Sequence, residues 1–238
     1  MRNHRFITMS MLLLWVSACS VLQAQNRFSG GFGYISLGSS KIENQAINQI
    51  HNQEGYPSFA PASLVLNGGG FGVIKGILIG GEGGVITPGT VAGAGYSSTL
   101  TTGYGMIQLG IMPRIPFITN KTGQIFAVLG VGRGVTVYEL QKEFWGSQSF
   151  NIDYKGISEQ LLMKFELNLA SFPFTLSKQD QSSGLLAGLS AGYLMNPQSN
   201  SIHSETQYFP YSPYVGPQAY TSGWYFTLRL GGGGMKKK

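Results

Sequence analysis

The chain has 238 residues, of which 11% are charged, 12% are aromatic and 35 are glycine, and its formal net charge is +6. The length suits one large or two small domains, and the charged share lies well below the roughly 25% of a typical soluble domain. Because five of the positive charges lie at the two chain ends, little remains for a basic patch, and no nucleic-acid-binding surface is indicated.

The N-terminus has the three parts of a secretory signal peptide. Arg2 and Arg5 form a basic start, an apolar stretch follows over 6–18, and small residues lead up to Ala24. We therefore expect a signal peptide over 1–24, followed by one exported domain over 25–238.

A second interpretation of the leader is lipidation. The stretch "VSAC" resembles the lipobox of bacterial lipoproteins, in which Cys19 would carry acyl chains and anchor the protein. Both interpretations export the protein, and neither offers a disulfide because Cys19 is the single cysteine.

Eight segments of the body have the pattern of β-strands. A tilted strand needs about 9–11 residues to cross a bilayer, whereas no apolar run in the body approaches the roughly 20 residues of a membrane helix. The expected strands are Arg27–Gly38, Ser63–Ile74, Gly76–Ile86, Thr101–Met112, Gly123–Leu140, Ile157–Phe172, Gly184–Met195 and Ser222–Gly234.

The segment Ile157–Phe172 shows the clearest alternation. One face is apolar, from Leu161 to Leu169, and the other carries Lys164 and Glu166, with Leu162 as the exception. In a soluble sandwich the charged face would meet water, whereas in a membrane barrel it would point into the lumen. The low charge of the chain favours the barrel, so we expect Lys164 and Glu166 to face inward.

The gaps between the expected strands alternate roughly between long and short. Outer-membrane barrels have longer loops outside the cell and short periplasmic turns, and an even strand count puts both termini on one side. We therefore expect the long loops 39–62 and 196–221 outside, available to other envelope proteins.

The first long loop also contains a helix signal. The stretch from Ser40 to Glu43 fits a capping box, and Gly55 is a plausible stop, so we expect a short amphipathic helix over 41–53. Its apolar stripe consists of Ile42, Ala46, Ile47 and Ile50.

Glycine is frequent inside the expected strands, which suits a small closed barrel because glycine permits curvature and close packing. No glycine-rich stretch has the Gly-Lys-Ser/Thr of a phosphate loop or the helix that follows a dinucleotide fingerprint.

Four charged residues are candidates for the barrel interior. Unpaired charges there would be costly, so we expect a paired network in the lumen. The candidates are Glu82, Lys164, Glu166 and Arg229. Arg133 is a further candidate whose facing the pattern leaves open. Such a network either plugs the barrel or lines a gated path.

No metal, cofactor or catalytic site is indicated. His51 and His203 lie in different loops without cysteine partners, whereas a zinc site needs three or four ligands. The run His203–Glu205 has the residue types of a hydrolase, but three adjacent loop residues cannot form a triad. A lipid-modifying enzyme is kept as a minor alternative.

With these features the chain resembles the small outer-membrane β-barrel proteins of Gram-negative bacteria. The resemblance rests on the leader ending "LQAQ", the strand pair "LNGGGFGVIKGILIGGEGGVI" and the last strand "GWYFTLRLGGGGM". It implies an all-β fold, a single antiparallel up-and-down transmembrane barrel of about eight strands, placed in the outer membrane and surrounded by its lipid. The chain departs from the family at its end, where three lysines follow Met235 in place of an aromatic residue.

We therefore expect a non-enzymatic outer-membrane barrel with a structural or interaction role through its outer loops. The alternatives are a narrow passive pore for small solutes and a lipid-anchored, lipocalin-like exported barrel that binds a small apolar ligand. The lipocalin-like alternative requires a polar outside, with Lys164 and Glu166 exposed to water.

Overall fold

The computed structural model of the chain describes residues 28–42, 44–53, 55–93, 96–113, 123–143, 151–175, 181–198, 200–204, 215–219 and 221–237. The expected signal peptide over 1–24 and Cys19 lie outside these residues. None of the helices in the described ranges is long and apolar enough to span a membrane.

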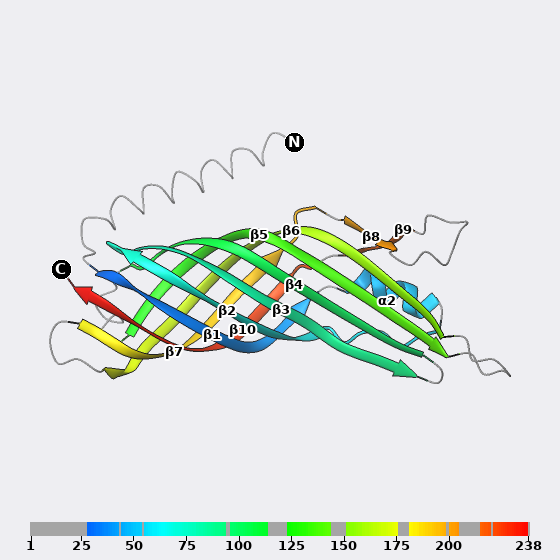
Figure 1. The fold of residues 1–238 in the computed structure, drawn as a ribbon, viewed down its shortest axis with the longest axis horizontal. Coiled ribbons are helices and arrows are strands. Elements are labelled where there is room, and N and C mark those ends of the chain that lie inside the picture. The colour runs from blue at the N-terminus through cyan, green and yellow to red at the C-terminus, as the bar shows by residue number, and fades with distance from the viewer. Residues whose placement is uncertain are drawn as a thin grey trace.

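Eight long strands close into a ring (Figure 1). Their order is β5-β4-β3-β2-β1-β10-β7-β6, and a pairing of β5 with β6 completes the circle. All neighbours are antiparallel, which confirms the expected up-and-down barrel. The strands are β1 (Phe28–Ile42), β2 (Ala62–Ile74), β3 (Ile77–Gly93), β4 (Tyr96–Ile111), β5 (Gly123–Glu143), β6 (Asn151–Thr175), β7 (Gln181–Met195) and β10 (Gly223–Lys237).

The first and last strands place the chain ends together. Phe28 at the start of β1 pairs with Lys237 at the end of β10, so both lie at one end of the barrel, called here the terminal end. The β2–β3 hairpin turns at this end through only Lys75 and Gly76, with φ of 51° and 83°. Two successive positive φ angles are the mark of the tight hairpin turns that match strand twist.

In β6 the charged face of the alternating pattern points into the barrel. Phe165 and Leu167 are 45% and 52% exposed on the outer wall, whereas Lys164 and Glu166 are buried in the lumen. Leu162, the exception to the alternation, is also buried inside, where it joins an apolar layer. The lipocalin-like alternative required the opposite facing of these charges, so the structure contradicts it.

Two pairs of strands, β3–β4 and β5–β6, project further than expected at the end opposite the termini. The sequence suggested gaps over 87–100 and 141–156, but β3 continues to Gly93, β4 begins at Tyr96, and β5 and β6 reach Glu143 and Asn151. The stretch 87–100 is rich in Ser and Thr, whereas 141–156 is rich in other polar and charged residues. Their alternation buries Ser98 and Leu100 on one side, which is enough to maintain a strand.

The last long loop is also partly strand. Instead of an irregular loop over 196–221, the structure has β8 (Asn200–Ser204) and β9 (Val215–Ala219). β8 pairs with the N-terminal part of β6, and β9 pairs with β8. The sheet that rises from the barrel therefore has the order β3-β4-β5-β6-β8-β9, and we call it the projection.

The expected short helix is present, but its start is different. α2 (Gln45–Gln53) begins after β1, and the residues of the supposed capping box up to Ile42 are strand residues. Strand pairing of β1 on both sides, including Lys41 with Trp224, takes precedence over a local cap. Gly55, with φ of 77°, follows the helix as the sequence suggested.

α2 fills the concave side of the projection (Figure 1). Ile47 of the helix and Phe59 of the following segment are buried against Leu100 of β4 and Tyr138 of β5. The helix therefore covers the mouth of the barrel at the end opposite the termini.

Candidate functional site

The four predicted lumen residues come together in one cluster, called here the four-charge cluster. Lys164 Nζ lies 2.6 Å from Glu82 Oε1 and 3.2 Å from Glu166 Oε2. Arg229 Nη2 lies 2.6 Å from Glu166 Oε1 and 3.4 Å from Glu82 Oε2. Their side chains are at most 2% exposed. Two carboxylates and two cations balance, so the cluster carries no net charge.

The positions follow from strand geometry. Lys164 and Glu166 are two residues apart in β6 and share the inward face. Glu82 comes from β3 and Arg229 from β10, neither of which neighbours the other in the ring. The cluster thus links strands of the barrel that share no backbone hydrogen bonds with each other.

Tyrosine hydroxyls complete the coordination of the two carboxylates. Tyr34 donates to Glu82 Oε2 at 2.7 Å and Tyr104 to Glu82 Oε1 at 3.0 Å. Tyr225 donates to Glu166 Oε2 at 2.6 Å. Buried ion pairs repay their desolvation cost only when such additional hydrogen bonds are present.

Asn168 and an aromatic ring hold the guanidinium. Asn168 Nδ2 donates to Glu166 Oε1 at 2.9 Å, while its Oδ1 accepts a hydrogen bond from Arg229 Nη1. The Arg229 guanidinium carbon also lies 4.1 Å from the centre of the Tyr34 ring, a cation–π arrangement. The sequence interpretation missed these partners, although Asn168, Tyr104 and Tyr225 share the inward strand positions of the charges.

Arg133 does not join the cluster. Its side chain is exposed on the outer wall, opposite Gly105 of β4 and Leu161 of β6. The inward positions around it are Gly132 and Gly134, which leave room for side chains of neighbouring strands. Glycine carries no polarity signal, so alternation could not assign this strand.

Apolar layers close the lumen on both sides of the four-charge cluster. Toward the terminal end lies a layer whose members include Phe32, Phe71, Leu78 and Phe126. Toward the mouth a second layer includes Val65, Ile86 and Leu162.

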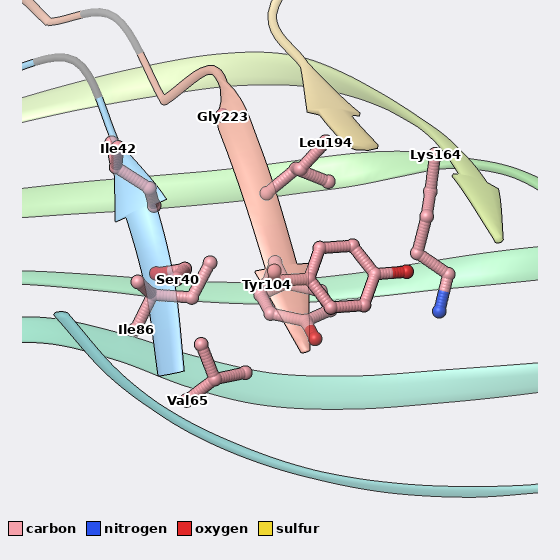
Figure 2. A pocket seen from close by; sticks show the side chains of 9 residues that line it. Ser40, Ile42, Val65, Ile86, Tyr104, Lys164, Leu194 and Gly223 are labelled. Carbon is pink, nitrogen blue, oxygen red and sulfur yellow. The ribbon is translucent and has the colours of Figure 1, made fainter. Parts of the chain in front are cut away.

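A cavity of about 10 Å³ beside Lys164 lies in the lumen (Figure 2). That volume is about enough for one water molecule. Besides Lys164, its lining is Ser40, Ile42, Val65, Ile86, Tyr104, Leu194, Gly223 and Tyr225.

Between the second apolar layer and the mouth, the described interior residues are polar but uncharged. Thr136 Oγ1 lies 2.8 Å from Thr102 Oγ1 and accepts a hydrogen bond from Gln160 Nε2 at 2.7 Å. Gln160 in turn accepts from Asn196 Nδ2 at 3.1 Å. The side chains satisfy one another, so this layer is part of the packed interior.

His51 fastens the helix to the barrel. Its Nδ1 donates to the carbonyl oxygen of Pro57 at 2.8 Å, and Nε2 lies 2.9 Å from the hydroxyl of Tyr138 on β5. The ring is fully buried. Asn48 holds the return segment through two hydrogen bonds with the backbone of Phe59, at 2.7 and 3.1 Å. His51 therefore has a structural role that the sequence did not suggest.

The structure brings the two histidines to different elements. His203 lies in β8, where it pairs with Ile157 of β6, and Glu205 lies outside the described residues. Across the described ranges, no group of three or more His, Cys, Asp or Glu could hold a metal ion.

The outer wall of the barrel is an apolar belt. Large apolar side chains are exposed on every strand of the ring, for example Ile35, Leu64, Ile107, Leu189 and Leu228 at 54–72%. Toward the projection the belt ends with Trp224 and Tyr193, whose rings meet edge to face at 5.0 Å. Charged side chains are exposed beside this pair of rings or further toward the projection, namely Lys41, Glu139 and Glu159.

Comparison with known proteins finds likeness in structure alone. No protein-family model and no curated protein matches the chain. Among solved structures, the chain is similar to Ail, the attachment invasion locus protein of Yersinia pestis, in complex with the heparin analogue sucrose octasulfate. The identity is 10% and the TM-score 0.45, covering 87% of this chain and 98% of Ail.

Neisserial surface protein A is similar at 9% identity and a TM-score of 0.29, covering 89% of this chain and 97% of that protein. Both are small outer-membrane eight-strand β-barrel proteins of Gram-negative bacteria, the class that the sequence resembles. The fold assignment itself rests on the pairing of this chain's own strands, which makes it an eight-stranded antiparallel up-and-down β-barrel.

Proposed function

We propose that this chain is a non-enzymatic β-barrel protein of the bacterial outer membrane, with a structural or interaction role through the projection and α2. The exposed apolar belt supports a place in lipid, because a soluble barrel would carry polar side chains there. Closure of the ring supports it too, since lipid offers no hydrogen bonds to a free strand edge.

The filled lumen is the observation that carries the choice between scaffold and pore. The four-charge cluster lies between two apolar layers, and the cavity beside it has room for about one water molecule. A passive path would need a continuous wet channel. The part of the molecule free to meet a partner is then the projection, which rises past the belt.

The leader belongs to the same proposal. A signal peptide over 1–24 would deliver the chain to the envelope, and cleavage after Ala24 or lipidation at Cys19 is decided by the mass of the mature protein.

Cell fractionation followed by gel electrophoresis with and without boiling tests the proposal. A closed outer-membrane barrel stays folded in detergent until heated, so the outer-membrane band is expected to shift on boiling. A protein recovered in the soluble fraction without a shift would contradict the membrane proposal. Steady single-channel conductance of the purified protein in planar bilayers would favour the pore instead.

A further inference from the structure

The outer wall carries a groove of about 520 Å³ that crosses β6, β7, β10 and β1 and is also lined by Ile125 of β5. That volume lies within the usual range for small-molecule sites, roughly 300–1,000 Å³. At its centre Ala191 of β7 faces outward between Leu167 of β6 and Phe226 of β10, its direct partners in the two neighbouring strands. A small side chain between two large ones makes the hollow.

The chemistry of the groove indicates a hydrocarbon occupant. Its apolar lining includes Leu37, Leu167, Leu189, Phe226 and Leu228, and no charged residue among those the structure describes lines it. All five are more than half exposed. Covering such apolar surface is favourable. Because the groove is continuous with the apolar belt, an acyl chain of a neighbouring lipid can enter it directly.

A lysine and two aromatic rings lie at the end of the groove nearer the projection. Trp224 is the next outward residue of β10 after Phe226, about 6.6 Å further along the strand. Tyr193 contacts its ring. Lys41 of β1 is the direct partner of Trp224 and is exposed on the same face. Within the described ranges no carboxylate pairs with Lys41.

Along the wall, the apolar groove is followed by the two aromatic rings and Lys41. A lipid has the same order, from its acyl chains to its charged headgroup. Tryptophan and tyrosine favour the level of the headgroups, and lysine reaches from an apolar wall toward charged groups at the surface. We propose that this wall binds one anionic, phosphate-bearing lipid, with its phosphate on Lys41 and one acyl chain over Ala191. The inference rests on the proposed membrane location.

Native mass spectrometry of the full chain in detergent, titrated with dioleoyl phosphatidic acid or dioleoyl phosphatidylcholine, tests the site. One tightly held lipid is expected, with phosphatidic acid preferred. Lys41→Gln is expected to weaken phosphatidic acid binding roughly fivefold and phosphatidylcholine binding less, because the choline cation offsets the charge of its phosphate. Ala191→Phe fills the groove and is expected to weaken both lipids.

Val85→Phe, on the outer face of β3 away from the groove, is the matched control and is expected to bind like the parent protein. If Ala191→Phe loses its heat-modifiable band, Ala191→Leu replaces it as the smaller filling. Tight lipid binding that survives both Lys41→Gln and the filling variant would overturn the site.

Two further outcomes separate the sources. Displacement of the phosphatidic acid by excess inorganic phosphate would assign the site to free phosphate, and a dimer abolished by Ala191→Phe would assign it to a second copy of the chain. A parent protein that shows the heat shift yet retains no lipid overturns this inference and leaves the proposed membrane location intact.

Discussion

Glu82 and Lys164 meet inside the barrel at 2.6 Å, although β4 and β5 separate their strands in the ring. Both side chains are removed from water, and the other two charges of the cluster complete their neutralisation. Removing one partner of such a pair leaves a buried charge uncompensated, whereas removing both does not. The predictions below start from this difference.

Replacement of one member of the pair is expected to destabilise the barrel strongly. Glu82→Gln or Lys164→Met should lower the free energy of unfolding by about 3–5 kcal/mol, measured by urea titration in lipid vesicles. The double variant should lose clearly less than the sum of the two. Additive losses would show that the pair is not coupled.

The exposed pair of Lys155 and Glu139, 4.0 Å apart on the projection, provides the control. Lys155→Met should change the free energy of unfolding by less than about 1 kcal/mol, because exposed ion pairs contribute little.

The tyrosine hydroxyl on Glu166 is expected to matter as well. Tyr225→Phe keeps the ring and removes the 2.6 Å hydrogen bond to a charged acceptor. We expect a loss of about 1.5–3 kcal/mol in the same titration. Tyr193→Phe, on the outer wall, is the matched control, and an equal loss in both variants would argue against a specific role for Tyr225.

A charge on the apolar belt tests which face meets lipid. Leu167→Arg places a cation on the outer wall of β6 and should cost about 2–4 kcal/mol if that position lies near the middle of the bilayer. Gln141→Arg, exposed on the projection, should be nearly neutral. Equal stability of the two variants in vesicles would contradict a lipid-facing belt.

The link between α2 and the barrel is expected to be local. His51→Ala removes the contacts with Pro57 and Tyr138, so amide hydrogen exchange should speed up in α2 while the barrel strands keep their protection. Asn52→Ala, which removes only an exposed contact with Ser58, should leave exchange in α2 close to that of the parent. Faster exchange throughout the barrel would instead give His51 a global role.

Alternation was sufficient to predict the facing of Lys164, Glu166 and Arg229, because each has apolar neighbours on both sides in its own strand. That logic failed at Arg133, whose neighbours along β5 are glycines, and glycine is compatible with either face. The partners of the charges were harder to predict, since Tyr34 of β1 and Tyr225 of β10 bond carboxylates on other strands, which depends on register.

The projection escaped prediction for a different reason. β8 and β9 are only five residues long. β8 pairs with the N-terminal part of β6, which is far from it in the sequence. The supposed capping box beginning at Ser40 failed in the same way, because non-local strand pairing outweighed a local helix signal. Local patterns in this chain were reliable only where long-range pairing agreed with them.

Arg229 lies on β10, which comes last in chain order among the strands of the ring. Before β10 joins β1 and β7, Glu82, Lys164 and Glu166 together carry two negative charges and one positive charge, a net charge of −1. Sealing the ring and neutralising its centre are therefore the same event. An incompletely closed barrel holds an unbalanced carboxylate that favours water, and only the final strand makes a dry interior stable.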